Sequence, residues 1–121
     1  MGQFKVKVRL AAFGPGPNGK GRSIELLVDT GATYTTIPRD ILSGCGVPVT
    51  GQVQVKLADG SLRSKDYGPA IIEVEGKAVG TTVLFGESGD LPLLGVTTLE
   101  VAALGVDPVA RRLVPIQAIQ A

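Results

Sequence analysis

A single carboxylate in a tight turn is the residue of this sequence best placed to do chemistry. Asp29 lies in the run Val28-Asp29-Thr30-Gly31-Ala32, directly after a series of apolar residues. The chain therefore carries the acid toward the interior, where an ionised carboxylate is costly unless it is paired, hydrogen-bonded or protonated. Gly31 allows the backbone to turn sharply and to come close to another group. Asp29 is accordingly either a structural turn residue or an acid with a chemical role.

The residue types that are missing exclude several classes of enzyme. The 121-residue chain has no histidine, which excludes Ser-His-Asp and Cys-His catalysis and the common zinc sites with histidine ligands. Its one cysteine, Cys45, can form no intrachain disulfide, fits a reducing compartment and is most simply a small apolar filler. We expect neither a metal site nor a cofactor.

The charges of the chain are almost balanced. Lysine and arginine number 12 against 11 aspartates and glutamates, a net charge of +1. No long-range field would recruit a polyanion, so we expect neither nucleic acid nor a membrane as a partner. Residues 1–5 lack an apolar signal core, and nowhere do 18 apolar residues follow one another. We therefore expect a cytoplasmic protein.

The elements that must position Asp29 are predicted to be strands of one mostly β domain covering residues 1–121. Seventeen glycines and eight prolines accompany many valines and few helical patterns. Apolar and charged residues alternate from Phe4 to Leu10, which is typical of a strand covered on one face. The strands predicted in this part of the chain are residues 4–10, 23–29 and 33–37, with a hairpin loop over residues 14–21.

Two hairpins are predicted in the middle of the chain. Asp59-Gly60 lies between an alternating arm that begins at Gln52 and a polar arm that ends at Tyr67, which is a strong hairpin signal. A second, shorter hairpin turns at Gly76-Lys77. One or two helical turns are expected after Pro38, because proline favours the first position of a helix.

The clearest helical pattern lies near the C-terminus. Apolar residues at helical spacing predict a helix over residues 99–104, with Thr97 or Thr98 as N-cap and Gly105 as its C-terminal stop. A last strand is expected over residues 111–119, where a proline suits an edge position.

The order of these features resembles the retropepsin-like aspartic proteases, the single-lobe proteases of retroviral type (clan AA). The resemblance rests on Val28-Asp29-Thr30-Gly31-Ala32 after an apolar strand, on Leu93-Leu94-Gly95 before the helix, and on the spacing between them. About two thirds of the chain takes part in it. It implies an all-β, closed barrel-like acid-protease fold with one short C-terminal helix.

The resemblance implies that Asp29 is one half of a catalytic pair in an aspartic endopeptidase. Only one Asp-Thr-Gly is present, so the second carboxylate would come from an identical chain across a twofold axis, in a homodimer. The two acids would share one proton and one water, and the water would attack the peptide bond without a metal or a covalent intermediate. Thr30 would bond to the partner's backbone, Gly31 would admit the substrate, and Ala32 completes the supporting loop.

The resemblance also implies how a peptide is held. Ala58-Asp59-Gly60-Ser61 would be the tip of a flap that closes over an extended peptide or protein substrate, and Thr33 and Tyr34 would contact its backbone. Leu93-Leu94-Gly95 would be a structural loop. Retroviral members commonly carry an acidic residue and an arginine where this chain has Thr33 and Val96, so the dimer is expected to be held differently.

Three other interpretations are compatible with the same residues. Asp and Gly are ordinary turn residues, so Asp29 alone can belong to a structural turn. The same fold can also serve as a non-catalytic dimeric module that binds an extended peptide. A third alternative, a small-ligand β-barrel, predicts a closed apolar cavity instead of a cleft between two chains.

Overall fold

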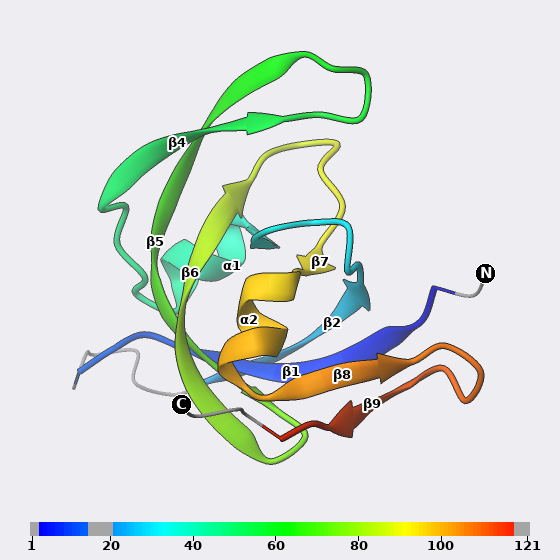
Figure 1. Cartoon of the computed structure of the whole chain (residues 1–121). Coiled ribbons are helices and arrows are strands. Elements are labelled where there is room, and N and C mark those ends of the chain that lie inside the picture. Colours follow the sequence, from blue (N-terminus) through cyan, green and yellow to red (C-terminus); the bar gives the residue numbers. More distant parts are fainter. Residues whose placement is uncertain (1–2, 15–20, 118–121) are drawn as a thin grey trace, which may run out of the picture.

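The computed structural model describes residues 3–14 and 21–117 and consists mostly of short strands (Figure 1). The all-β class predicted from the sequence is confirmed. The elements are β1 (Lys5–Ala11), β2 (Arg22–Val28), β3 (Thr35–Pro38), α1 (Arg39–Gly44), β4 (Gly51–Lys56), β5 (Leu62–Val74), β6 (Lys77–Gly86), β7 (Leu93–Leu94), α2 (Val96–Val101), β8 (Leu104–Asp107) and β9 (Arg112–Pro115). Most of the predicted loop over residues 14–21 lies outside the described residues.

Six of the strands close into a barrel. The sheet has the order β1-β2-β7-β3-β6-β5-β4, and β1 also pairs with β5, so the ring returns to its first strand. Closure leaves few unpaired strand edges. β4 stands outside the ring and pairs with β5 alone in the described part of the chain. The β4–β5 hairpin therefore extends away from the barrel, as the upper part of Figure 1 shows.

The core lies inside this ring and follows the alternation of the strands. In β1, Val8 and Leu10 are buried while the charged residues between them are exposed. β2 alternates as well, although its sequence is almost continuously apolar: Leu26 and Val28 are buried, whereas Leu27 is only half-buried. Phe85 and Ile37 fill the centre on neighbouring strands, because Ile37 of β3 pairs with Phe85 of β6. Each such buried side chain stabilises the fold by roughly 2 kcal/mol relative to an exposed one.

Both helices are short, and the ends of α2 differ from the prediction. Gly95 is the N-cap of α2, without a side-chain cap, so the expected cap at Thr97 or Thr98 is wrong. Ala103 takes the left-handed conformation after the helix, with φ of 55°, in place of the predicted Gly105. This conformation costs a non-glycine residue roughly 1 kcal/mol. Ile116 offsets part of that cost by donating its backbone N–H to Ala103 O at 2.9 Å.

A small second sheet follows α2. Gly105 lies inside β8, which pairs with β9 in antiparallel register from Leu104↔Pro115 to Asp107↔Arg112. The sequence predicted only the second of these strands and made it too long: β9 ends at Pro115, and residues 116–117 are not part of a strand. Leu104 and Leu113 are buried and fix this sheet to the core.

Across residues 3–14 and 21–117, no helix has the length and apolar character needed to cross a membrane.

Candidate active site

Asp29 begins the turn that follows β2. Its backbone N–H donates to Leu94 O at 3.0 Å, and its own carbonyl accepts from Ala32 N at 3.2 Å. Asp29 as a whole residue is half-buried, and its Oδ1 accepts the N–H of Gly31 at 2.9 Å. These three bonds fix the backbone and one carboxylate oxygen, so the side chain has a defined direction. Thr30 and Gly31 form the exposed end of the turn.

The turn is supported by a two-residue strand from a distant part of the sequence. β7 lies between β2, to which it is parallel, and β3, to which it is antiparallel. Leu94 pairs with Val28 and Leu93 pairs with Leu27, and Leu27 N donates to Pro92 O at 3.1 Å. The predicted structural loop therefore lies directly beside the strand that carries Asp29.

Gly95 permits the closest backbone contact of this region. A Cβ atom at this position would lie 2.4 Å from Tyr34 C and 2.9 Å from Thr35 N, distances that no side chain can occupy. The absence of a side chain lets the segment after β7 pack directly on the chain entering β3. Any larger residue must push these two segments apart.

Three threonines form a buried polar cluster beneath the turn, and the sequence reasoning missed all three roles. Thr98 Oγ1 lies 2.7 Å from Thr35 Oγ1 and 3.2 Å from Thr81 Oγ1, and Gly95 N donates to Thr35 Oγ1 at 3.0 Å. Thr35 and Thr98 are fully buried. The burial of Thr35 could have been predicted from the sequence. Thr35 and the core residue Ile37 are alternate residues of one strand, so their side chains lie on the same face.

The remaining residues predicted near Asp29 lie at the junction of the turn with α2. Val96 N donates to Ala32 O at 2.8 Å, and Thr97 N donates to Thr33 O at 3.0 Å. These two bonds join the segment that contains Thr33 to the start of α2, which contains Val96. Thr33 is exposed and Tyr34 is half-buried, so Thr33 is the more accessible of the two residues predicted to contact substrate.

The tip of the β4–β5 hairpin is a tight turn closed by its own aspartate. Asp59 Oδ1 accepts from Ser61 N at 2.9 Å and from Ser61 Oγ at 2.6 Å, and Gly60 has φ of +87°. These bonds hold the pKa of Asp59 below its usual range. All four predicted tip residues, from Ala58 to Ser61, are exposed. Asp59 is thus a turn former in this structure.

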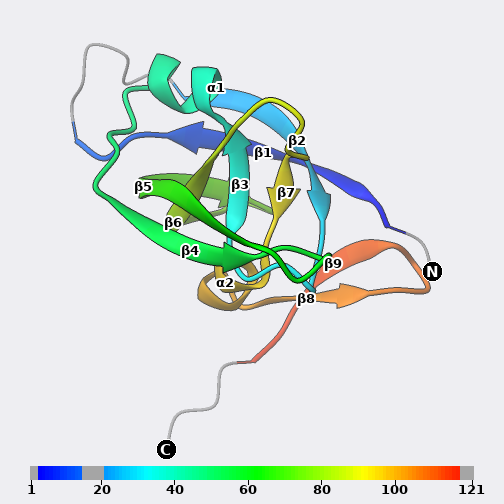
Figure 2. The ribbon, with the colours of Figure 1, turned by 90° about the horizontal axis from the view of Figure 1, so that it is seen from above.

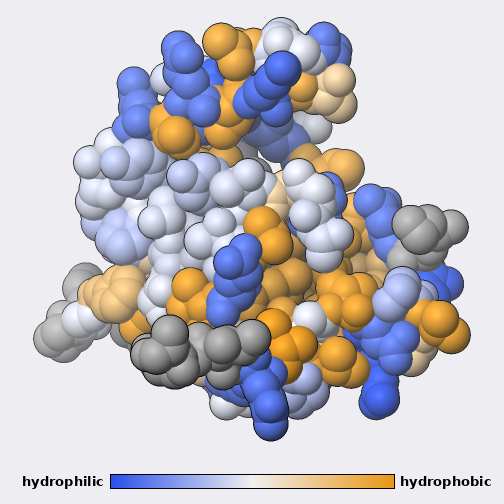
Figure 3. Space-filling model, viewed as in Figure 1, coloured by the Kyte–Doolittle hydropathy of each residue, from blue (hydrophilic) through white to orange (hydrophobic). Residues whose placement is uncertain are grey.

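The hairpin overhangs the Asp29 turn. Figure 1 shows it above the loop that joins β2 to β3, and Figure 2, seen from above, shows its tip crossing over that loop. The space-filling view in Figure 3 shows the surface indented between the hairpin and the rest of the molecule. The described residues contain no group of three or more Cys, Asp and Glu able to hold a metal ion. The arrangement offers a carboxylate on one side of an opening and a hairpin on the other.

Comparisons with known proteins agree with this architecture. A family model described as "gag-polyprotein putative aspartyl protease" matches residues 18–101, which is more than half of the chain. No curated protein matches the chain. Among solved structures, the chain is similar to EIAV protease complexed with the inhibitor HBY-793, with a TM-score of 0.57, 17% identity, and coverage of 82% of this chain and 86% of that one. The resemblance read from the Asp29 turn is therefore confirmed: the chain belongs to the retroviral-type aspartyl protease family.

Proposed function

We propose that this chain is an endopeptidase that acts as a homodimer, with Asp29 of each copy forming the catalytic pair. The observation that carries the proposal is the Asp29 turn, which is held from below by Leu94 O and has one carboxylate oxygen fixed by Gly31 N. The family match supports proteolysis as the class of reaction. Because the sequence contains one Asp-Thr-Gly, the second carboxylate comes from a second copy.

The proposed reaction uses one shared proton. Two carboxylates a few ångströms apart cannot both carry a full charge cheaply, so in this proposal the pair shares one proton. The ionised Asp29 takes a proton from a bound water, and the oxygen of that water attacks the peptide carbonyl carbon. The protonated Asp29 of the other copy donates to the carbonyl oxygen, and a proton then passes to the leaving amine.

The other parts of the site have positioning roles in this proposal. Thr30 is exposed at the end of the turn, where its hydroxyl can bond to the partner's backbone and lock the two turns together. The β4–β5 hairpin is the flap that covers an extended peptide and excludes water. Thr33 is the accessible residue next to the turn, and its polar groups can bind the peptide backbone.

The deciding experiment is cleavage of a mixed peptide library across pH by the native protein and by Asp29→Asn. We expect the substitution to reduce cleavage by about 10³-fold or more, because the amide can neither take nor give the proton. Asp40→Asn is the matched control, since Asp40 is an exposed acid on α1, and it should retain full activity. Cleavage that survives in Asp29→Asn would rule out the mechanism.

The oligomeric state is tested separately. Sedimentation of the native protein should show a dimer at the concentrations that give cleavage. A protein that remains monomeric at high concentration removes the shared-site mechanism. A verified dimer that cleaves nothing at any pH, yet binds peptides from the library, favours the non-catalytic peptide-binding module.

A further inference from the structure

The β4–β5 hairpin leaves the barrel at a defined point of β5. Residues 67–74 of this strand pair with β6, whereas residues 62–67 pair with β4. Lys65 and Asp66 are the last two residues before the strand gains its second neighbour. Beyond them, backbone pairing within the described chain holds the hairpin only to itself. Motion of the hairpin relative to the barrel must therefore be concentrated near these two residues.

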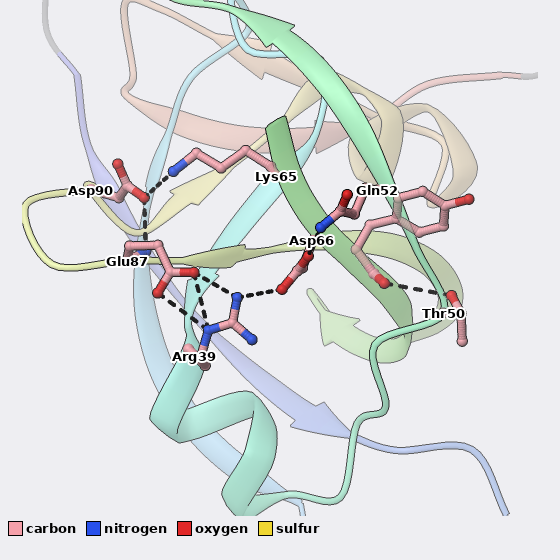
Figure 4. Close-up of polar contacts among 8 residues, drawn as sticks. Arg39, Thr50, Gln52, Lys65, Asp66, Glu87 and Asp90 are labelled. Atoms are coloured by element: carbon pink, nitrogen blue, oxygen red, sulfur yellow. Dashed lines mark hydrogen bonds and ion pairs between the residues drawn. The ribbon is translucent and has the colours of Figure 1, made fainter. Parts of the chain in front are cut away.

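Asp66 is bound by residues from two other elements. Arg39, the first residue of α1, donates from Nη2 to Asp66 Oδ2 at 2.7 Å, and Gln52 of β4 donates from Nε2 to Asp66 Oδ1 at 2.8 Å. Arg39 also donates to both carboxylate oxygens of Glu87, with Nη2 to Oε2 at 2.6 Å and Nε to Oε1 at 3.2 Å. Its guanidinium lies 5.0 Å from the centre of the Phe85 ring. Figure 4 shows Arg39 between the two acids.

Lys65 makes the second connection. Its side chain is 8% exposed, and its ammonium donates to Asp90 Oδ2. The same oxygen accepts Glu87 N at 2.8 Å, and Asp90 N donates to Glu87 O at 3.0 Å. Residues 87–90 thus form a closed turn in which Asp90 binds Lys65 of β5 directly and Glu87 binds Arg39, which in turn binds Asp66 of β5 (Figure 4). We call Arg39, Lys65, Asp66, Glu87 and Asp90 the hairpin-root cluster.

The turn at residues 87–90 leads directly to the support of Asp29. Two residues after Asp90, Pro92 O accepts the N–H of Leu27 in β2, and Leu94 O then accepts the N–H of Asp29. The hairpin-root cluster therefore ties the start of the hairpin to the same segment that fixes the acid. The position of the hairpin-root cluster therefore sets how far the hairpin lies from Asp29 and in which direction it points.

We propose that Lys65 and Asp66 are positioning residues that hold the β4–β5 hairpin over the Asp29 turn through Asp90, Arg39 and Glu87. This proposal rests on the proposed function, in which the hairpin covers the substrate. Removing one member leaves a partly buried charge without its partner, and this is relieved when the hairpin root opens and admits water. The covered state then loses population to an open state.

The first test does not depend on cleavage. Backbone hydrogen exchange is measured in the full chain for the native protein, Lys65→Met, Lys65→Arg and the control Lys56→Met, which removes an exposed lysine from β4. We expect exchange over residues 51–66 to become about tenfold faster in Lys65→Met and to stay within about twofold in Lys65→Arg and Lys56→Met. Exchange in β1 and β2 should not change. Equal acceleration of the barrel and the hairpin, or no acceleration at all, overturns the proposal.

The second test separates positioning from a merely structural role. In peptide hydrolysis, Lys65→Met should raise KM about tenfold while kcat stays within about twofold, because the hairpin contributes equally to binding of substrate and transition state. Lys65→Arg should restore the native KM. A loss of kcat at unchanged KM overturns the assignment. If the native protein cleaves nothing, the proposed function fails while hydrogen exchange still decides whether the cluster holds the hairpin.

A milder variant keeps the proposal testable if Lys65→Met does not fold. Glu87 is 53% exposed, so Glu87→Gln weakens the cluster without burying an unpaired charge. Exchange over residues 51–66 should then become about threefold faster, with β1 and β2 unchanged. Exchange of the hairpin at the native rate in this variant also overturns the proposal.

Discussion

The two sides of the candidate site are held by different kinds of interaction. The floor, which we define as residues 29–35 and 92–98, is fixed by backbone hydrogen bonds and by neutral hydroxyls buried around Thr98. The cover, which is the β4–β5 hairpin, is fixed at its root by ionised side chains of the hairpin-root cluster. Neutral buried bonds do not respond to pH or salt, whereas ion pairs do. The backbone and hydroxyl framework of the floor should therefore change little with pH and salt, whereas the attachment of the cover at its root should respond to both.

The largest expected effect comes from breaking the floor at Gly95. Gly95→Ala places a Cβ 2.4 Å from Tyr34 C, so the backbone on one side must move. We expect the free energy of unfolding to fall by about 3 kcal/mol, measured by chemical denaturation. Gly105→Ala is the control, since its Cβ would meet only the Cγ2 methyl of Ile116, at 3.0 Å, and no backbone atom, and should cost below about 1 kcal/mol. Equal losses in the two variants would contradict this account of Gly95.

A smaller effect is expected from removing one hydroxyl of the floor. Thr98→Val keeps the side-chain volume but leaves the hydroxyls of Thr35 and Thr81 without their shared partner. Unfolding free energy should fall by about 2 kcal/mol, equally at pH 7 and at pH 4 because no charge is involved. Thr97→Val is the control and should be nearly neutral, since the neighbouring bond to Thr33 uses the Thr97 backbone. A pH-dependent loss would show that the floor is coupled to a titrating group.

Acid should loosen the cover before the floor. Hydrogen bonds from Gln52 and Arg39 lower the pKa of Asp66, and hydrogen bonds from Arg39 lower the pKa of Glu87. Burial acts to raise the pKa of Asp90, but the bond from Lys65 and the backbone bond from Glu87 outweigh it and lower that pKa. A carboxylate with a lowered folded pKa contributes stability above its unfolded pKa and loses it as the pH falls through the folded value.

The measurement is hydrogen exchange of the hairpin, corrected for intrinsic rates, from pH 7 to pH 3. Residues 51–66 should keep their protection down to about pH 4, near the ordinary pKa of an acidic side chain, and lose it below that value, while β1 and β2 stay protected. In Glu87→Gln, the hydrogen-exchange protection of residues 51–66 should depend less steeply on pH. A hairpin whose protection is flat throughout this range would remove the distinction between floor and cover.

The smallest effect is expected at the tip of the cover. Asp59→Ala removes the acceptor for Ser61 N and Ser61 Oγ, so the amide of Ser61 should exchange faster. Thermal stability should not change measurably, because all four tip residues are exposed. Asp59→Asn serves as the control because its amide oxygen can accept the same bonds. A clear loss of thermal stability in Asp59→Ala would mean that the tip contributes to the core after all.

The sequence allowed the local features of the site to be predicted, but not the contacts between distant segments. Asp29 at the end of an apolar strand, the hairpin at Asp59-Gly60 and the glycine at position 95 each depend on a few neighbouring residues. Thr98 was misread as a possible helix cap because its hydroxyl is used by Thr35, which is 63 positions away. No local pattern contains that information.

The charged residues at the hairpin root were missed for the same reason. Arg39 and Glu87 are 48 positions apart, and Lys65 and Asp90 are 25 positions apart, so nothing in the sequence pairs them. β8 was missed because Gly105 was taken as the end of the helix, although Ala103 already makes that turn with positive φ. Intrinsic propensity favours glycine at the position that Ala103 occupies, but the packing of Leu104 and Leu113 in the core overrode that preference.

The placement of β7 has a consequence for when the site comes into existence during synthesis. β2 and β3 flank the Asp29 turn in sequence, yet they are neighbours in the sheet only through Leu93 and Leu94, which are made much later. A nascent chain that ends before β7 contains Asp29 without the strand that shapes its turn. Non-local pairing of this kind forms slowly. The Asp29 turn can therefore take its final form only after Leu93 and Leu94 have been synthesised and have paired between β2 and β3.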